Sequence, residues 1–212
     1  MEQVIIITAL ILSIVLHEVA HGYMANWLGD PTARLQGRLS ANPLVHRDPV
    51  GSIVVPGLLF FSGVGILFGW AKPVPYNPYN FSDQRYGEAK VAAAGPAVNL
   101  ILAFIFGMLI RLAPELGLPG SFIDIASYIV YINILLAFFN LIPIPPLDGS
   151  KIITVLLPLG LAEKYRNLSM QIERYGLLFT FLFIFVFINI LWMPFSKLIF
   201  AVFEIFTGMS GF

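Results

Sequence analysis

The stretch Leu16-His17-Glu18-Val19-Ala20-His21-Gly22 lies inside an apolar run that extends from Val4 to Leu28. Histidines four residues apart on a helix project from one face about one turn apart, so both imidazoles can reach a single metal ion. Glu18 is placed beside them to take a proton from a water molecule at that metal, as in zinc hydrolases. Because three ionisable side chains inside a hydrocarbon-spanning segment are costly, we favour a metal site over a set of surface residues.

The composition indicates a polytopic membrane protein. Of the 212 residues, 58% are hydrophobic and 11% are charged, whereas soluble domains contain about 25% charged residues. The formal net charge is zero and there is no basic run, so nothing suggests a nucleic-acid partner. The chain contains no cysteine, and any metal must therefore be held by His, Asp or Glu.

Segments apolar and long enough to cross a bilayer are predicted at residues 4–27, 90–112, 124–144 and 174–193. We interpret the first as a retained transmembrane helix, because Met1-Glu2-Gln3 carries no Lys or Arg and the apolar run is too long for a signal peptide. A shorter apolar stretch, 195–207, is expected to be an interfacial helix. The expected fold is a single domain, 1–212, formed by an all-α transmembrane helix bundle.

Residues 50–70 are also apolar, but Pro56 and several glycines interrupt them. We therefore expect residues 50–75 to form a small re-entrant β element, in which a short dipping helix is followed by an extended piece. The polar segments that flank this region carry most of the Lys and Arg residues, so the positive-inside rule places His17 and His21 toward the cytoplasm. A single crossing by 50–70 would put Asp148 on the opposite face, about 30 Å away.

Two further stretches extend the pattern of the first. Asn140-Leu141-Ile142-Pro143-Ile144-Pro145-Pro146-Leu147-Asp148-Gly149 follows the third long span, and Ala94-Gly95-Pro96-Ala97-Val98-Asn99 lies within the second. With the H-E-x-x-H motif, they resemble the N-x-x-P-x-P-x-L-D-G and A-G-P-x-x-N motifs of the site-2 proteases, which are intramembrane zinc metalloproteases. The chain is most similar to the short members without PDZ or CBS domains. Ser150 departs from the second glycine of many relatives.

The resemblance implies that Asp148 joins His17 and His21 as the third protein ligand of one zinc ion per chain, with Glu18 as the catalytic base. This agrees with the chemistry of catalytic zinc sites, which generally hold three protein ligands and a water molecule. Taken alone, Leu-Asp-Gly at a helix end is an ordinary turn sequence. The paired histidines and the family pattern together favour the ligand role.

The resemblance also implies that Asn99, Asn140 and Pro143 contribute to substrate binding. A helical substrate must unwind before it is cut, and Asn side chains offer the freed backbone groups both a donor and an acceptor. The alternative role of the two asparagines is interhelical hydrogen bonding. An extended edge at 66–75 is expected to pair with the unwound substrate, and His46 is expected to be a loop histidine bonded to Asp48 or to the backbone.

These features predict an intramembrane zinc endopeptidase of the cell membrane that cuts membrane proteins within or next to their transmembrane segments, with its active site toward the cytoplasm. The alternative is a membrane metal-ion transporter that uses the same ligands. A transporter needs a polar route to the other face, and the outer halves of these helices contain almost no ionisable residues. A third interpretation, a catalytically silent relative that only binds membrane partners, conflicts with the intact Glu18.

Overall fold

The computed structural model describes residues 2–48, 51 and 72–209 of the chain. Its longer helices are α1 (Glu2–Trp27), α4 (Gly87–Leu116), α5 (Gly120–Asn140), α7 (Leu159–Arg174), α8 (Gly176–Val186) and α9 (Trp192–Thr207). The shorter ones are α2 (Thr32–Leu35), η1 (Pro43–His46), η3 (Pro78–Asn80), α6 (Gly149–Leu156) and the π turn η4 (Phe187–Leu191). The part of the chain that the structure describes contains no strand.

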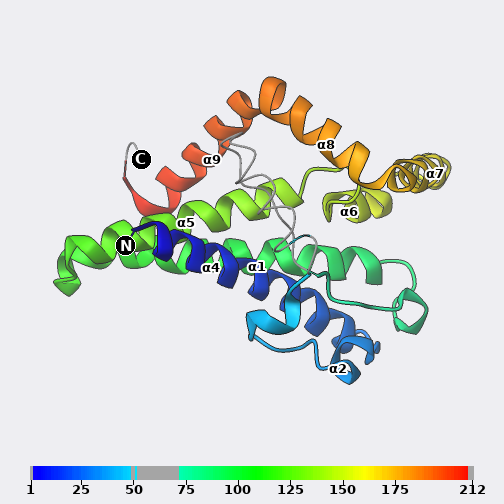
Figure 1. The fold of residues 1–212 in the computed structure, drawn as a ribbon, viewed down its shortest axis with the longest axis horizontal. Coiled ribbons are helices and arrows are strands. Elements are labelled where there is room, and N and C mark those ends of the chain that lie inside the picture. Colours follow the sequence, from blue (N-terminus) through cyan, green and yellow to red (C-terminus); the bar gives the residue numbers. More distant parts are fainter. Residues whose placement is uncertain (1, 49–50, 52–71, 210–212) are drawn as a thin grey trace.

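Three long helices, α1, α4 and α5, lie side by side and form the centre of the molecule (Figure 1). A three-residue connection reverses the chain between α4 and α5. At its start Gly117 adopts a left-handed conformation, with φ of 62°, which glycine reaches without the steric cost of a side chain. Small buried residues such as Ala103 and Ala126 let the helices approach closely. The buried core between α4, α5 and α9 therefore combines these alanines with larger residues, among them Val130, Ile134, Ile199 and Phe203.

The expected span at 174–193 and the expected helix at 195–207 form one continuous helical segment. The helices α8 and α9 are joined without a break by the π turn η4, and Figure 1 shows the bend between them. Pro194 in the first turn of α9 has no N–H and clashes with the carbonyl one turn earlier, which accounts for the widened turn before it. Residues 195–207 are thus the second half of a long bent helix and not a separate one.

The chain between α1 and α4 leaves and re-enters the bundle at the same end. The amide of Ser82, just before α4, donates to the carbonyl of Leu28, just after α1, at 2.7 Å. Nearby, Asp30 accepts hydrogen bonds from Asn77 N at 2.7 Å and Asn80 Nδ2 at 2.8 Å. This connection keeps the end of α5, and Asp148 after it, at the same end of the bundle as the C-terminal half of α1.

The expected re-entrant β element is not observed. Most of residues 50–75 lie outside the described residues, and the described part, 72–77, has no regular secondary structure. Two prolines, Pro73 and Pro75, remove backbone donors that a strand would need. The described fold is therefore all-helical.

Within the described residues, four helical segments are long and apolar enough to cross a membrane, which makes this a multi-pass membrane protein. Their bounds are Gln3–Trp27, Gly87–Leu116, Gly120–Asn140 and Leu178–Thr207, with mean hydropathies between 2.0 and 2.3. The third begins four residues before the predicted 124, at the residue after Pro119. It ends at Asn140 because the following Pro143 cannot continue a helix.

Candidate metal centre

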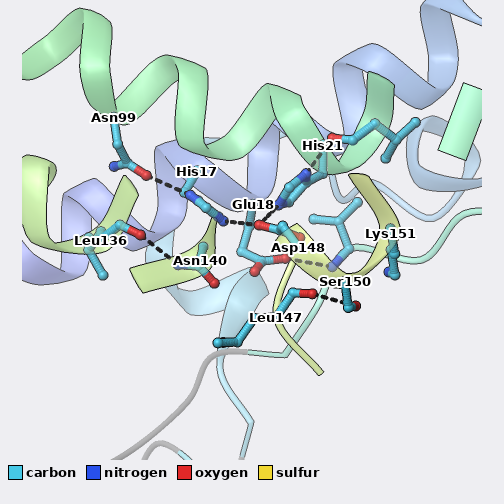
Figure 2. A network of polar contacts seen from close by, with 12 residues as sticks. His17, Glu18, His21, Asn99, Leu136, Asn140, Leu147, Asp148, Ser150 and Lys151 are labelled. Atoms are coloured by element: carbon cyan, nitrogen blue, oxygen red, sulfur yellow. Dashed lines mark hydrogen bonds and ion pairs between the residues drawn. The ribbon is translucent and has the colours of Figure 1, made fainter. Parts of the chain in front are cut away.

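Two histidines of α1 and one aspartate at the start of α6 converge at the end of the bundle where α1 finishes. Nε2 of His17 lies 3.1 Å from Oδ2 of Asp148, and Nε2 of His21 lies 3.4 Å from the same oxygen. One ligand atom from each of these three residues lies within 4.8 Å of the other two. Figure 2 shows both rings pointing at the carboxylate.

The far side of each imidazole ring is held by a hydrogen bond. Nδ1 of His21 donates to the carbonyl of Val91 at 2.7 Å, and Nδ1 of His17 donates to Oδ1 of Asn99 at 2.5 Å. With Nδ1 protonated, each Nε2 presents a lone pair toward Asp148. This is the second layer of contacts that orients histidine ligands in metal sites.

Asp148 is held as a carboxylate. Burial by itself would raise its pKa, but when the rings also carry protons on Nε2, the hydrogen bonds and charges of His17 and His21 outweigh burial and hold the pKa of Asp148 well below its ordinary value. The turn before it is tight, because a side chain at Gly149 would overlap the carbonyls of Leu141 and Ile142. Glycine at position 149 thus allows the backbone to pass close to these two carbonyls, which places Asp148 next to the two histidines.

The three residues face a cavity of about 160 Å³ that Glu18 also lines. Oε2 of Glu18 accepts the backbone N–H of Val74 at 2.9 Å, and its other carboxylate oxygen has no hydrogen-bond partner among the described residues. The segment that carries Val74 is held from behind by Arg38, whose guanidinium donates to the carbonyl of Lys72 at 2.8 Å. Pro73 and Val74 therefore form one wall of the cavity.

A lysine and a tyrosine form another part of the cavity wall. Nζ of Lys151 donates to the hydroxyl of Tyr76 at 2.7 Å, and both residues line the cavity. Burial lowers the pKa of Lys151, but Tyr76 and the nearby carboxylates of Glu88 and Asp148 raise it further than burial lowers it. Lys151 therefore brings a positive charge to the cavity.

The residues predicted to bind substrate occupy different places. Asn140 lines the cavity. Its Nδ2 donates to the carbonyl of Leu136 at 2.9 Å, and its Oδ1 accepts no hydrogen bond from the described residues. Asn99 is fully buried behind His17 and does not reach the cavity. Pro143 is exposed, its carbonyl accepts the hydroxyl of Tyr165, and Pro146 lines the cavity in its place.

His46 is a buried loop histidine, as expected. Its Nε2 donates to the carbonyl of Ser40 at 2.8 Å, and it is not one of the three residues that converge at the centre. Its own carbonyl accepts the amide of Lys72 at 2.8 Å, so this loop supports the segment that contacts Glu18.

Sequence reasoning did not identify three residues that shape the centre: Lys151 and Tyr76, which line the cavity, and Gly95, where a Cβ atom would overlap both histidine rings. Gly95 was visible within the A-G-P-x-x-N stretch, and Lys151 follows the L-D-G stretch by two positions. Tyr76 carried no such signal, because it lies in an irregular segment.

The donor set fits zinc. Two imidazole nitrogens and one carboxylate oxygen are a common set for catalytic zinc, which leaves a fourth position open. Tetrahedral bonds of 2.0–2.1 Å place neighbouring ligand atoms about 3.3 Å apart, close to the 3.1 and 3.4 Å that separate the histidine nitrogens from Asp148.

Comparison with known proteins identifies relatives of the same chemistry. Residues 118–187 match the sequence profile of Peptidase family M50, a region that contains Asp148. YwhC of Bacillus subtilis (strain 168), named as a candidate zinc metalloprotease, is 41% identical over 191 residues, which cover 85% of this chain and 80% of YwhC. Rip2 of Mycolicibacterium smegmatis, named in the same way, is 30% identical over 154 residues, which cover 69% of this chain and 54% of Rip2. The comparison with solved structures gave no match.

The resemblance drawn from the sequence motifs is thus confirmed. An identity of 41% that extends over most of both proteins, together with the profile match, shows that this chain belongs to peptidase family M50, the site-2 protease family of zinc metalloproteases.

Proposed function

We propose that this protein is an intramembrane zinc endopeptidase that hydrolyses peptide bonds within or next to transmembrane segments of membrane-protein substrates. The observation that carries this proposal is the convergence of His17, His21 and Asp148 beside Glu18, inside a bundle of helices long enough to cross a membrane. Membership in a family of zinc metalloproteases supports the same chemistry.

In this proposal one zinc ion per chain is held by Nε2 of His17, Nε2 of His21 and Oδ2 of Asp148. Zinc, when bound, supplies a Lewis acid that lowers the pKa of water to about 7 and polarises the peptide carbonyl. Glu18 takes the proton of the attacking water with the carboxylate oxygen that Val74 does not hold. It then passes the proton to the nitrogen of the leaving amine.

Two other parts of the cavity act on the substrate. The ammonium of Lys151 and the hydroxyl of Tyr76 stabilise the negative charge that develops on the carbonyl oxygen, because fixed donors in a site shielded from water act strongly on such charge. Oδ1 of Asn140, which has no partner among the described residues, accepts a backbone N–H of the unwound substrate. The exposed Pro143 and the buried Asn99 take no part in this contact.

The proposed active site faces the cytoplasm. The parts of the chain that join the membrane-spanning helices at the end of the bundle near Asp148 are rich in positive charge. The positive-inside rule assigns such segments to the cytoplasmic side. These residues are Arg34, Arg38, Arg47, Lys72, Arg85, Lys151, Lys164 and Arg166. Two basic residues, Arg111 in α4 and Lys197 in α9, lie toward the other end of the bundle.

The test is cleavage of a single-span substrate by the purified protein reconstituted in lipid nanodiscs. We expect cleavage by the wild type, loss of cleavage on zinc chelation, and recovery when zinc is returned. Glu18→Gln should bind zinc as the wild type does but cut at least about 100-fold more slowly, since general acid–base catalysis contributes roughly 10²- to 10⁴-fold. Zinc uptake into liposomes without any cleavage would instead indicate a metal transporter.

A further inference from the structure

Behind His17, away from the cavity, three helices each contribute a polar side chain that is buried. Ser13 of α1 is 4% exposed, and Asn99 of α4 and Asn133 of α5 are 0% exposed. Asn99 contacts His17 directly, as Figure 2 shows, whereas Asn133 contacts it only through Asn99. Such polar groups are retained in apolar helices either to hold helices together or for function.

The hydrogen bonds of this cluster have a fixed direction. Nδ2 of Asn133 donates to the backbone carbonyl of Ile129 at 2.9 Å, and a carbonyl only accepts. The other end of that amide, Oδ1, therefore faces Nδ2 of Asn99, which donates to it at 2.7 Å. Oδ1 of Asn99 is then left to accept Nδ1–H of His17.

Neither amide can be reversed without losing hydrogen bonds. The second N–H of Asn133 donates to Oγ of Ser13 at 2.9 Å, and the second N–H of Asn99 donates to the carbonyl of Ser13 at 3.4 Å. Rotation of either amide by half a turn would place acceptors against acceptors in an apolar interior, which is costly. The orientation of Asn99 therefore depends on Asn133.

We propose that Asn133 is a positioning residue for the metal centre, which acts through Asn99 to keep the proton of His17 on Nδ1 and the lone pair of Nε2 directed at the zinc site. His21 needs no such support, because the backbone carbonyl of Val91 holds its Nδ1–H directly. The inference rests on the proposed zinc site, but it does not require that the protein cuts peptides.

A double-mutant cycle tests the inference through zinc affinity, measured by competition with a chelator in nanodiscs. Asn133→Leu removes the acceptor for Asn99, and we expect zinc to bind roughly tenfold more weakly, as for other residues behind metal ligands. In Asn99→Asp, the carboxylate only accepts hydrogen bonds and holds Nδ1–H by itself. Adding Asn133→Leu to Asn99→Asp should therefore change zinc affinity less than about twofold.

Ser127→Ala is the matched control, because Ser127 is a buried polar residue of α5 whose Oγ has no hydrogen-bond partner in the described part of the chain. It should leave zinc affinity unchanged. If Asn133 only holds the helices together, Asn133→Leu will weaken zinc by the same factor in both backgrounds, which would overturn the inference. Zinc affinity is read without a substrate, so an absence of proteolysis would contradict the proposed function and leave this inference standing.

A second measurement uses the wild-type chain and does not depend on whether the variants fold. In zinc-loaded protein labelled with ¹⁵N-histidine, the nitrogen chemical shifts distinguish a ring protonated on Nδ1 from one protonated on Nε2, and His17→Gln identifies the signals of His17. We expect His17 to be protonated on Nδ1. Protonation on Nε2 would overturn the inference.

Discussion

Gly95 leaves no space for a side chain beside His17. A Cβ atom at position 95 would lie 2.6 Å from both Cε1 and Nε2 of His17, and 2.6 Å from Nε2 of His21. The backbone of α4 is therefore in direct contact with the edges of both rings that face Asp148. Together with the hydrogen bonds to Asn99 and Val91, this contact leaves the imidazoles one position in which both Nε2 atoms point at the carboxylate.

Gly95→Ala should weaken zinc binding and cleavage together. The added methyl group must displace the two ligand rings, and overpacking of this kind costs about 1–3 kcal/mol, which corresponds to a loss of roughly 5- to 150-fold in zinc affinity. Gly160→Ala is the control, because a Cβ at that helical position has no atom within 4 Å. Equal zinc affinities for the two variants would show that the rings tolerate displacement.

Lys151→Met should slow cleavage while zinc remains bound. The substitution keeps most of the length of the side chain but removes the positive charge from the cavity, and loss of one such donor typically lowers kcat by roughly 10²-fold. The measurement is kcat for a single-span substrate, with zinc content determined on the same sample. Unchanged kcat would remove Lys151 and Tyr76 from the proposed stabilisation of the carbonyl oxygen.

Asp30 should make the fold sensitive to acid. Its carboxylate is fully buried, and burial by itself raises its pKa. The hydrogen bonds from Thr32, Asn80 and Asn77 lower the pKa by more than burial raises it, so the pKa is lower than in the unfolded chain. A lowered folded-state pKa contributes stability that is present above the unfolded value, near 3.8, and is lost as the pH falls through the folded value.

Thermal unfolding in detergent, followed by circular dichroism, measures this contribution. At neutral pH, Asp30→Asn should lower the free energy of unfolding by about 2 kcal/mol, since the donors lose a charged acceptor. The difference from the wild type should shrink below about pH 4. Asp83→Asn is the control, because the ion pair of Asp83 with Lys90 is solvated and contributes little. A difference for Asp30→Asn that does not change with pH would contradict the role of its charge.

The residues of the candidate metal centre were predictable because spacing determines their geometry. Histidines 17 and 21 share a helix face whatever surrounds them, and the membrane makes their presence informative. Asp148 was predictable only through its motif, because the connectivity of residues 28–86 decides at which end of the bundle it lies. The hydrogen bond between Ser82 and Leu28 gives that connectivity.

Other features depend on rotation and packing that a sequence pattern does not encode. Asn99 was expected to meet substrate, but it is buried where α4 packs against α1 and contacts the back of His17. The same packing brings Gly95 against the rings. Pro143 and Pro146 both belong to the proline-rich turn, and only its three-dimensional path shows that Pro146 lines the cavity. The continuity of α8 and α9 was missed because residues 195–207 were expected to form a separate interfacial helix.

The orientation of the bundle can be tested with single cysteines, because the natural chain has none. Ser82 and Ser121 are both exposed and lie near opposite ends of α4 and α5. In intact cells, a membrane-impermeant maleimide should label Ser121→Cys, and Ser82→Cys should be labelled only after the membrane is opened. The reverse pattern would place the proposed active site on the outer side.

The position of the cut bond is the most direct test of whether the protein cleaves its substrates within the membrane. We propose to incubate the reconstituted wild type, and Glu18→Gln as control, with a single-span substrate and to identify both product ends by mass spectrometry. We predict a zinc-dependent cut within or next to the transmembrane segment, in its cytoplasmic half. Replacing Gly, Pro or Asn residues near the cut by Leu should slow cleavage, since the original residues weaken the substrate helix. Cuts confined to the soluble tails, or cuts made equally by Glu18→Gln, would contradict this prediction.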